Sequence, residues 1–249
     1  MIQALLTAVL LLPLQDTPPD PASVERAVTE LSEAFKQKDS QKRASAITRN
    51  SQVVDADVID LIERGLRDKS PEVVTSAIQA LRYMDHPDAL KALETTYRRD
   101  KKLRKDPQVF SSLLRAIGQH RSPSSIDLLA DDVWSSLDQS VVRARLYSLG
   151  HIRDPKAVKA LIGEMKSGGR QRIQPHMNDF RMALMALTGV DQGRSQDQWL
   201  KWWNDNKDGL EISPEEPKLP KAQAQTWSYY WGRGRVDERP KKRNRRGQN

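Results

Sequence analysis

The most informative absences in this 249-residue sequence are cysteine, aromatic residues and strand patterns. With no cysteine, disulfide bonds and thiolate-based metal or redox sites are excluded. Aromatic residues make up only 6% of the chain, whereas charged residues make up 30%. This balance is typical of thin helical layers that each expose a polar face. Because no stretch sustains the alternation of apolar and polar residues that a half-buried strand needs, we expect an all-α protein.

Catalytic and metal-binding motifs are also missing. The sequence contains no Gly-rich phosphate loop, no His-Glu-x-x-His and no Gly-x-Ser-x-Gly. Each histidine lies near the end of a predicted helix and is interpreted as a cap or turn residue: His86, His120, His151 and His176. His120 and His151 directly follow their helices, where a partly positive ring would suit the helix dipole. Asp131 and Asp132 are expected on a solvated helix surface. We therefore predict no enzyme, with no catalytic residues, no metal and no cofactor.

Positive charge is concentrated at the C-terminal end. The chain carries a formal net charge of +8, of which residues 232–249 supply +6. A polyanionic partner would therefore be attracted chiefly by this tail rather than by the rest of the chain.

The N-terminal segment has the character of a secretion signal. Residues 2–14 hold ten apolar residues and no charge, and the proline-rich stretch 15–21 follows. This length suits the apolar core of a signal peptide and is too short to span a bilayer. The alternative is a buried first helix, which Pro13 and the later prolines would end early. We interpret 1–15 as a signal peptide and 16–22 as a linker. This predicts an extracytoplasmic protein, periplasmic or secreted, and a cytoplasmic one if the signal is not real. No other segment is long and apolar enough to cross a membrane.

One pattern recurs along the chain at intervals typical of stacked helices. A proline behind a polar residue occurs at Pro87, Pro123 and Pro155, at spacings of 36 and 32 residues. Proline suits the first turn of a helix because its missing N–H would be unpaired there. Self-similarity at this period indicates a helical-repeat array, in which each pair of helices buries its apolar stripe only against its neighbours.

The same periodicity predicts five helix pairs over residues 23–190. The expected pairs are 23–38 with 40–50, 55–67 with 71–84, 87–103 with 107–119, 123–137 with 139–151, and 155–167 with 175–188. The turn within each pair is expected to be short.

These repeats resemble the HEAT family, in the short variant common in bacterial proteins and related to PBS-lyase-type repeats. The resemblance is carried by Asp-Pro-Lys-Ala-Val-Lys-Ala-Leu at 154–161 and Asp-Lys-Ser-Pro-Glu-Val-Val at 68–74, together with the helical segments 77–81 and 146–150. It implies a right-handed, armadillo-like α-solenoid that serves as a protein-interaction scaffold. Because solenoids host unrelated tasks, it identifies architecture better than activity.

A second resemblance follows the last repeat. Leu-Thr-Gly at 187–189 and Trp-Leu-Lys-Trp-Trp at 199–203 are similar to the ending of secreted bacterial repeat proteins of this kind. Trp199, Trp202 and Trp203 fall on one stripe of a helix, at i, i+3 and i+4. We interpret residues 191–209 as a helix that covers the open end of the core. The alternative is a platform that stacks on a carbohydrate or another ligand.

The second helix of each pair is expected to line the concave side of the solenoid, as the resemblance implies. The outward positions there form a polar, somewhat basic row: Thr75, Gln79, Arg82, Ser111, Arg115, Arg143 and Tyr147, with Arg181 extending it. Forked arginine contacts of this kind suit an extended acidic or anionic partner. The alternative is a merely solvated face.

Residues 210–249 are predicted to form a flexible aromatic and basic tail. Its candidate binding residues are Trp227, Tyr229, Tyr230, Trp231, Arg233, Arg235, Lys241, Lys242, Arg243, Arg245 and Arg246. Such residues stack on bases and neutralise phosphates, or bind anionic polymers and lipid headgroups outside the cell. The four aromatic residues could instead dock back on the solenoid and protect the tryptophan cap.

Taken together, the sequence predicts a non-catalytic scaffold outside the cytoplasm that binds a protein or an anionic polymer on the solenoid surface. A first alternative is binding of nucleic acid or another polyanion through residues 227–246, although nucleic acid is the less favoured partner of a secreted protein. A second is a lyase-type enzyme, which would need a deep pocket of convergent polar groups that the sequence does not indicate. The oligomeric state is left open.

Overall fold

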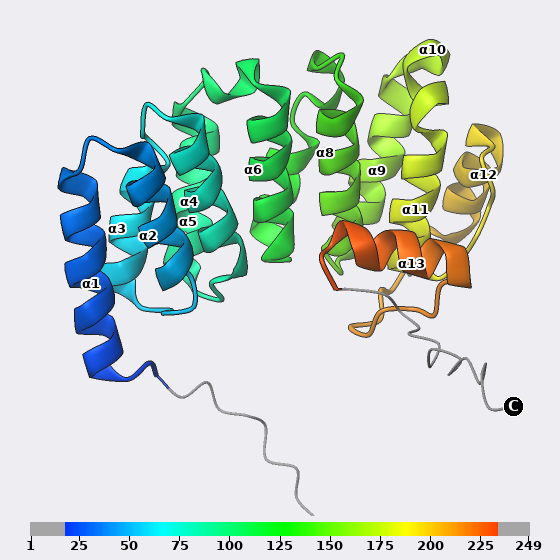
Figure 1. The fold of residues 1–249 in the computed structure, drawn as a ribbon. Helices are drawn as coiled ribbons and strands as arrows, with labels where there is room; N and C mark the ends of the chain where they lie inside the picture. The colour runs from blue at the N-terminus through cyan, green and yellow to red at the C-terminus, as the bar shows by residue number, and fades with distance from the viewer. Residues whose placement is uncertain (1–17, 234–249) are drawn as a thin grey trace, which may run out of the picture.

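The computed structural model describes residues 18–233, and within this range every regular element is a helix (Figure 1). The signal peptide predicted at 1–15 and the basic residues beyond 233 lie outside the described range. Within it, no helix is long and apolar enough to cross a membrane.

Five helix pairs stack side by side, and the predicted all-α solenoid is confirmed (Figure 1). The pairs are α1 (Pro21–Lys36) with α2 (Ser40–Asn50), α3 (Ala56–Gly65) with α4 (Pro71–Tyr83), α5 (Pro87–Arg99) with α6 (Pro107–Gln119), α7 (Ile126–Ala130) with α8 (Gln139–His151), and α9 (Pro155–Ser167) with α11 (Met177–Thr188). A short helix, α10 (Gly169–Ile173), lies inside the last pair, and α12 (Gln196–Asn206) and α13 (Lys221–Tyr230) follow it.

Local capping explains where the helices begin. Pro87 and Pro155 occupy the first turns of α5 and α9, where a missing N–H leaves no bond unmade. The Asp154 carboxylate accepts a hydrogen bond from the Lys156 amide at 2.7 Å, and His86 Nδ1 accepts one from the Asp88 amide at 3.2 Å. His86 therefore acts as the predicted cap.

The second helices of the pairs, α2, α4, α6, α8 and α11, form one layer and contact one another more extensively than the first helices do. Closer spacing in this layer curves the stack toward it, so we call its outer surface the concave face. Glycine permits the closest approach: a Cβ on Gly118 of α6 would lie 2.3 Å from Ser148 Oγ of α8. One continuous apolar core runs between the layers from Ala27 to Trp199.

The helix predicted over residues 123–137 is wrong. Pro123 opens only a 3-10 turn, α7 is five residues long, and Asp132 then adopts the left-handed conformation with φ of 58°. Arg145 of α8 fills the space and donates hydrogen bonds to the Leu128 and Leu129 carbonyls at 3.2 and 3.1 Å. These carbonyls stay unpaired in a short helix, so the arginine satisfies them. Asp131 and Asp132 consequently lie in a turn, not on a helix.

The tryptophan-rich helix α12 packs on the last helix pair. Trp199 is fully buried in the main core, and its indole N–H donates to the Gly193 carbonyl at 3.0 Å. Trp202 and Trp203 are half-buried and pack against the same core. These indoles thus cover the end of the apolar layer.

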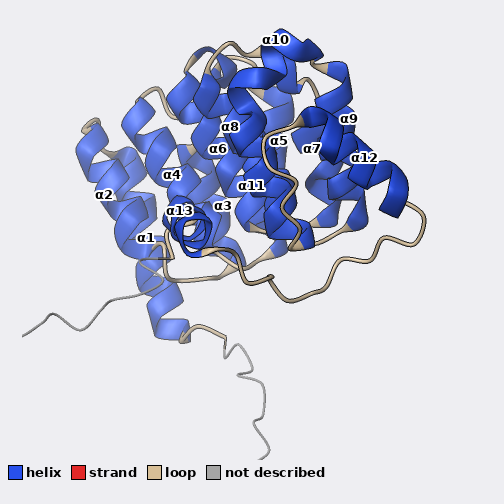
Figure 2. Ribbon diagram, turned by 90° about the vertical axis from the view of Figure 1, so that its right-hand side faces the viewer, coloured by secondary structure: helices blue, strands red, loops and turns tan. Residues whose placement is uncertain are grey.

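The flexible tail predicted from residue 210 is wrong for its described part. Residues 207–220 run back along one edge of the solenoid to α13, which lies across the second helices and is seen nearly end-on in Figure 2. Trp227, Tyr230 and Trp231 are spaced at i, i+3 and i+4, so they form one stripe that turns toward the concave face. The docking alternative describes this segment correctly, except that it docks on the concave face and not on the α12 cap.

Candidate functional site

The concave-face row predicted from the sequence separates into three groups. Arg82, Arg115 and Tyr147 contact α13 or the residues that end it. Thr75 and Ser111 line an open polar groove of about 760 Å³ at the other ends of α4 and α6, and Gln79 is half-buried between the two regions.

The remaining two row residues are already ion-paired. Arg143 donates from Nε to the Asp179 carboxylate at 2.8 Å, and Arg181 donates from Nε to Asp191 at 2.7 Å. Each pair raises the pKa of its arginine through the hydrogen bond to the carboxylate. Their charges are neutralised within the solenoid, so they do not extend the free basic row.

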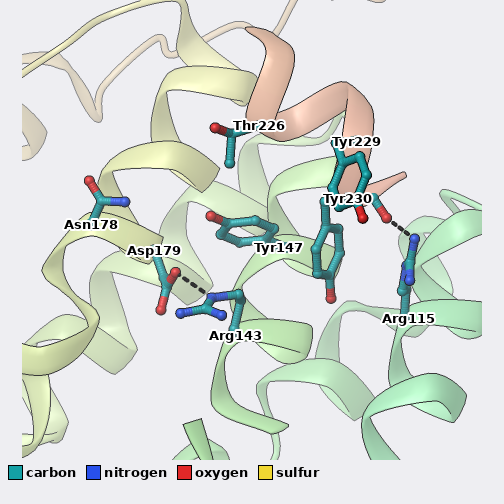
Figure 3. A pocket seen from close by; sticks show the side chains of 8 residues that line it. All are labelled: Arg115, Arg143, Tyr147, Asn178, Asp179, Thr226, Tyr229 and Tyr230. Carbon is teal, nitrogen blue, oxygen red and sulfur yellow. Dashed lines mark hydrogen bonds and ion pairs between the residues drawn. The ribbon is translucent and has the colours of Figure 1, made fainter. Parts of the chain in front are cut away.

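An aromatic cluster holds α13 on the concave face. We call the surface that α13 and Trp231 contact the seat, and it is formed by Arg82, Arg115, Tyr147, His151, Met182 and Ala186. Trp227 and Trp231 are buried against Tyr147 of α8 and against Met182 and Ala186 of α11. The Tyr147 ring lies 5.2 Å from the Trp227 ring, measured between centroids. Tyr230 meets Tyr147 edge-on, with the centroids 4.7 Å apart (Figure 3). Such tilted and edge-on pairs are the favoured arrangements of aromatic rings. This cluster is separate from the main core.

His151, the last residue of α8, forms the floor beneath Trp231. The two rings stack with centroids 4.0 Å apart and planes 13° from parallel. Burial, followed by the nearby charges of Arg121 and Arg233, lowers the His151 pKa to about 3. Its Nε2 accepts hydrogen bonds from Arg121 Nε at 3.0 Å and from Arg233 Nη2 at 2.6 Å, so Nδ1 carries the proton and donates to the Gly118 carbonyl at 3.1 Å.

The partly positive ring expected at His120 and His151 is therefore wrong. Burial also lowers the pKa of His120. The helix dipole favours a cation at these positions, but it is outweighed by desolvation, and at His151 also by two arginines.

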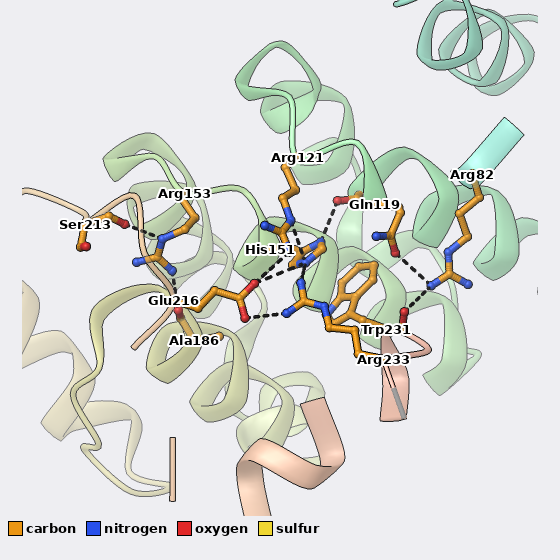
Figure 4. A network of polar contacts seen from close by, with 11 residues as sticks. Arg82, Gln119, Arg121, His151, Arg153, Ala186, Ser213, Glu216, Trp231 and Arg233 are labelled. Carbon is orange, nitrogen blue, oxygen red and sulfur yellow. Dashed lines mark hydrogen bonds and ion pairs between the residues drawn. The ribbon is translucent and has the colours of Figure 1, made fainter. Parts of the chain in front are cut away.

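Two arginines hold the C-terminal end of α13. Arg115 Nη2 donates to the Tyr230 carbonyl, and its guanidinium lies 4.7 Å above the Tyr230 ring (Figure 3). Arg82 Nη2 donates to the Trp231 carbonyl at 3.5 Å and to Gln119 Oε1 at 3.2 Å (Figure 4). The last carbonyls of a helix lack intrahelical partners and carry partial negative charge, which is why cations suit them.

These two arginines face no carboxylate among the described residues. Arg82 is only 3% exposed, and burial together with the charge of Arg115 lowers its pKa to about 10. The buried Nε atoms of both side chains have no hydrogen-bond partner, and neither does the indole nitrogen of Trp231. The described part of the chain holds one other such buried atom, in Arg145. The seat is thus closely packed, but some of its buried hydrogen-bond donors have no acceptor.

Arg121, Glu216 and Arg233 form a polar cluster at the edge of the seat, which we call the latch. The Glu216 carboxylate accepts hydrogen bonds from Arg121 at 2.9 Å and from Arg233 at 2.6 Å (Figure 4). Burial raises the pKa of Glu216, but its bond to Arg233 and the charges of both arginines outweigh burial and leave the pKa lowered. Arg153 donates to the Ala186 and Leu187 carbonyls at 2.8 and 3.0 Å and also to the Ser213 carbonyl, which ties the linker to the end of α11.

A polar cavity of about 520 Å³ remains between α13 and the solenoid (Figure 3). It is lined by Arg115, Arg143, Tyr147, Asn178, Asp179, Thr226, Tyr229 and Tyr230. His176 shares a hydrogen bond of 3.1 Å with Asp179 at its edge, so the predicted turn histidine also supports an acidic side chain. Within residues 18–233, no three His, Asp or Glu side chains gather as a metal would require.

The described tail residues are mostly engaged in the seat. Trp227 and Trp231 are buried and Tyr230 is half-buried, so these rings are not free to stack on bases in this conformation. Tyr229 is 82% exposed, although it also lines the open side of the cavity, and Arg233 belongs to the latch. The other tail candidates lie outside the described residues: Arg235, Lys241, Lys242, Arg243, Arg245 and Arg246.

Sequence reasoning missed His151, Met182, Ala186, Glu216 and Arg121 as parts of this site. A signal was present. His151 lies four residues after Tyr147, and Ala186 four after Met182, so each belongs to the same helix face as its partner. The stripe at 227, 230 and 231 has the spacing that identified the α12 tryptophans. Glu216 had no such signal, because a single carboxylate in a polar linker resembles any solvated residue.

Comparison with known proteins supports the repeat architecture over part of the chain. The family model for HEAT repeats matches residues 28–105, from within α1 to the turn after α5. Among curated proteins, none matches the chain. The HEAT resemblance is therefore supported for the N-terminal repeats.

Proposed function

We propose that this protein is a non-catalytic interaction scaffold whose concave face binds a helical segment of another protein. HEAT repeats commonly serve as protein-interaction scaffolds, and the match at 28–105 supports this general class. The choice of surface and ligand rests on the geometry of the α13 seat.

The observation that carries the proposal is how the concave face accommodates a helix. α13 buries two indoles in an aromatic and aliphatic cleft, and its carbonyl end meets two arginines. An apolar groove that takes spaced anchor residues of an amphipathic helix is a recurring mode of peptide recognition. Aromatic anchors in a desolvated pocket also contribute most of the energy in protein interfaces. A surface that binds this segment in cis has the features needed to bind a similar one in trans.

The groove beside the seat extends the same surface. Its lining is polar and hydroxyl-rich around Thr75, Ser76, Ser111 and Ser112. These side chains suit hydrogen bonds with the polar face or the flanking backbone of a partner. The concave face therefore offers an apolar anchor site with a polar rim.

A binding experiment in trans tests the proposal. The full chain carrying Trp227→Ala and Trp231→Ala removes both buried indoles from α13 and leaves the seat open, and circular dichroism checks that the solenoid stays folded. A fluorescein-labelled, C-terminally amidated peptide of residues 220–231 is then titrated, with anisotropy as the readout. We expect saturable binding with a dissociation constant on the order of micromolar, as for a small interface with aromatic anchors.

Two peptide variants provide a matched control. Gln225→Ala alters an exposed side chain that does not line the cavity and is expected to leave affinity unchanged, whereas Tyr230→Ala removes a ring that contacts Tyr147 and Arg115. We expect the second change to weaken binding about tenfold or more. Absence of saturable binding, or equal affinity of the two variants, contradicts a helix-binding concave face.

We further propose that the protein acts outside the cytoplasm. This rests on the uncharged apolar segment 2–14 and the proline-rich stretch after it. N-terminal sequencing of the protein made in its own cells is expected to find a mature chain that begins near residue 16. A mature chain that still begins at residue 1 or 2 contradicts this location.

A further inference from the structure

Arg82 and Arg115 are the charged side chains whose environment is least explained by the scaffold alone. Arg82 is 3% exposed and is not ion-paired with any described residue. Both arginines have a buried Nε without a partner. A buried charge is normally paired, because removing it from water without compensation is strongly unfavourable.

α13 satisfies these arginines only in part. It offers the neutral carbonyls of Tyr230 and Trp231, and the contact from Arg82 is long, at 3.5 Å. A guanidinium presents five N–H donors in a planar fork that matches the two oxygens of a carboxylate. Charge-assisted bonds of that kind are about twice as strong as bonds to neutral acceptors. The pair is therefore better suited to an anion than to its present occupant.

We propose that Arg82 and Arg115 form a receptor for the C-terminal carboxylate of a partner chain that ends in an aromatic helix, and that α13 occupies this receptor in the free protein. The inference rests on the proposed function, because it specifies the ligand of the same concave face. The partner's last residue takes the place of Trp231, its carboxylate oxygens meet the two guanidiniums, and its aromatic side chains take the cleft of Tyr147, Met182 and Ala186.

The path of the chain after Trp231 favours a chain end over an acidic side chain. Gly232 has φ of +74°, and a Cβ at this position would lie 3.0 Å from the Tyr83 hydroxyl. Only glycine continues the chain here without strain. A partner that ends at the position of Trp231 avoids this turn, whereas one that continues with aspartate or glutamate is strained at this positive φ and must displace the Tyr83 hydroxyl.

Because α13 is tethered to the solenoid, it competes at an effective concentration of roughly millimolar. The natural partner must therefore bind more tightly than α13 does. The carboxylate supplies this difference, since it acts on the two arginines that α13 leaves incompletely paired. Displacement of α13 also breaks the contacts of Arg233 with Glu216 and His151.

Peptides that differ only at their C-terminus test the proposal. The peptide of residues 220–231 is prepared with a free carboxylate and with an amide, and both are titrated into the full chain carrying Trp227→Ala and Trp231→Ala at pH 7.5. We expect the acid to bind about tenfold more tightly, which is the difference between charge-assisted and neutral hydrogen bonds. A third peptide, residues 220–232 with Gly232→Asp and an amidated end, is expected to show no such gain.

Protein variants locate the effect. Arg82→Gln and Arg115→Gln, each made in the same background, are expected to remove most of the preference for the acid, and each is checked by circular dichroism. Arg181→Gln is the matched control, since that arginine is ion-paired with Asp191 away from the seat. In the wild-type chain, saturating acid peptide is expected to accelerate amide exchange in α13, whereas the amide peptide has a smaller effect.

The possible outcomes separate the two proposals. Equal binding of acid and amide overturns the carboxylate receptor but leaves a helix-binding concave face. A preference for the acid that survives both arginine variants overturns it as well. A gain by the Gly232→Asp peptide equal to that of the acid overturns the choice of a chain end. If neither the acid nor the amide binds, both the receptor and the proposed function are wrong.

Discussion

Replacing Trp231 by alanine is expected to undock α13 while leaving the solenoid folded. Burying an indole removes about 150–250 Å² from water, which stabilises by roughly 4–6 kcal/mol as an upper bound. The unpaired indole N–H of Trp231 offsets about 1–3 kcal/mol of this. The net loss is then about 1–5 kcal/mol, and the upper part of this range agrees with typical tryptophan-to-alanine changes.

The loss is confined to α13 because Trp231 belongs to the aromatic cluster and not to the main core. A ten-residue helix is unstable by itself in water, so an undocked α13 is expected to melt. Its amides should exchange roughly 5- to 4,000-fold faster, since each 1.4 kcal/mol is about a factor of ten. The thermal midpoint of the solenoid should stay within about 2 °C of wild type.

Hydrogen exchange followed by mass spectrometry measures both quantities peptide by peptide. Tyr229→Ala is the control and should leave α13 protected, because that ring is exposed. Phe180→Ala, in the main core, should lower protection throughout the solenoid. The reasoning is refuted if Trp231→Ala leaves α13 protected, or if it lowers the thermal midpoint as much as Phe180→Ala does.

Three further predictions concern the helices that carry the seat. Gly118→Ala places a methyl group 2.3 Å from Ser148 Oγ and should destabilise the fold by about 1–3 kcal/mol. Gly163→Ala meets no atom within 4 Å and should stabilise the fold by about 0.5–1 kcal/mol. Chemical denaturation measures both changes, and equal effects would contradict the close approach of α6 and α8. Trp199→Ala should lower the stability of the whole chain by about 3–5 kcal/mol in the same assay, because its ring closes the main core, and a loss limited to α12 exchange would contradict that role. The His151 pKa is lowered to about 3 from an unfolded value near 6.5, so the folded state binds fewer protons than the unfolded state between these pH values. The free energy of unfolding should therefore be at its full value above pH 6.5 and fall by up to about 1.4 kcal/mol per pH unit as the pH drops toward 3. His151→Gln should flatten this slope, and an unchanged slope would show that other groups cause it.

Much of the solenoid follows from local sequence signals. Pro71, Pro87, Pro107 and Pro155 each open a helix where the sequence predicts one, since proline and the cap before it act within a single turn. Pro123 has the same local context and still opens only a 3-10 turn. Arg145 compensates for the short helix, because its guanidinium donates to the Leu129 carbonyl, sixteen residues before it, and so supplies a hydrogen bond that a longer helix would have made within itself. No local sequence pattern predicts this contact between Arg145 and Leu129.

The sequence predicts the surface on which the candidate site lies, but it does not predict that α13 docks there. Helical spacing, together with the concave side that the HEAT resemblance implies, places Arg82, Arg115 and Tyr147 in one outward row, and these residues do meet a ligand-like segment. Their partner was predicted to be flexible because residues 210–226 are polar and rich in proline. The composition of residues 227–231 indicates a tail, whereas the i, i+3 and i+4 spacing of Trp227, Tyr230 and Trp231 indicates one helix face, and the docked helix agrees with the spacing.

The sequence by itself determined the helical class, the repeat period and the outward row of the second helices, because proline positions, caps and apolar spacing act over a few residues. Only the tertiary structure decided that α13 covers this row, that His151 stays neutral beneath Trp231, and that Arg82 is buried without a carboxylate. Each of these depends on which groups meet across separations of tens of residues or more, as Arg82 and Trp231 do 149 positions apart. Burial and pairing are properties of that encounter, and the free energy of a charge or an indole changes by several kcal/mol with it.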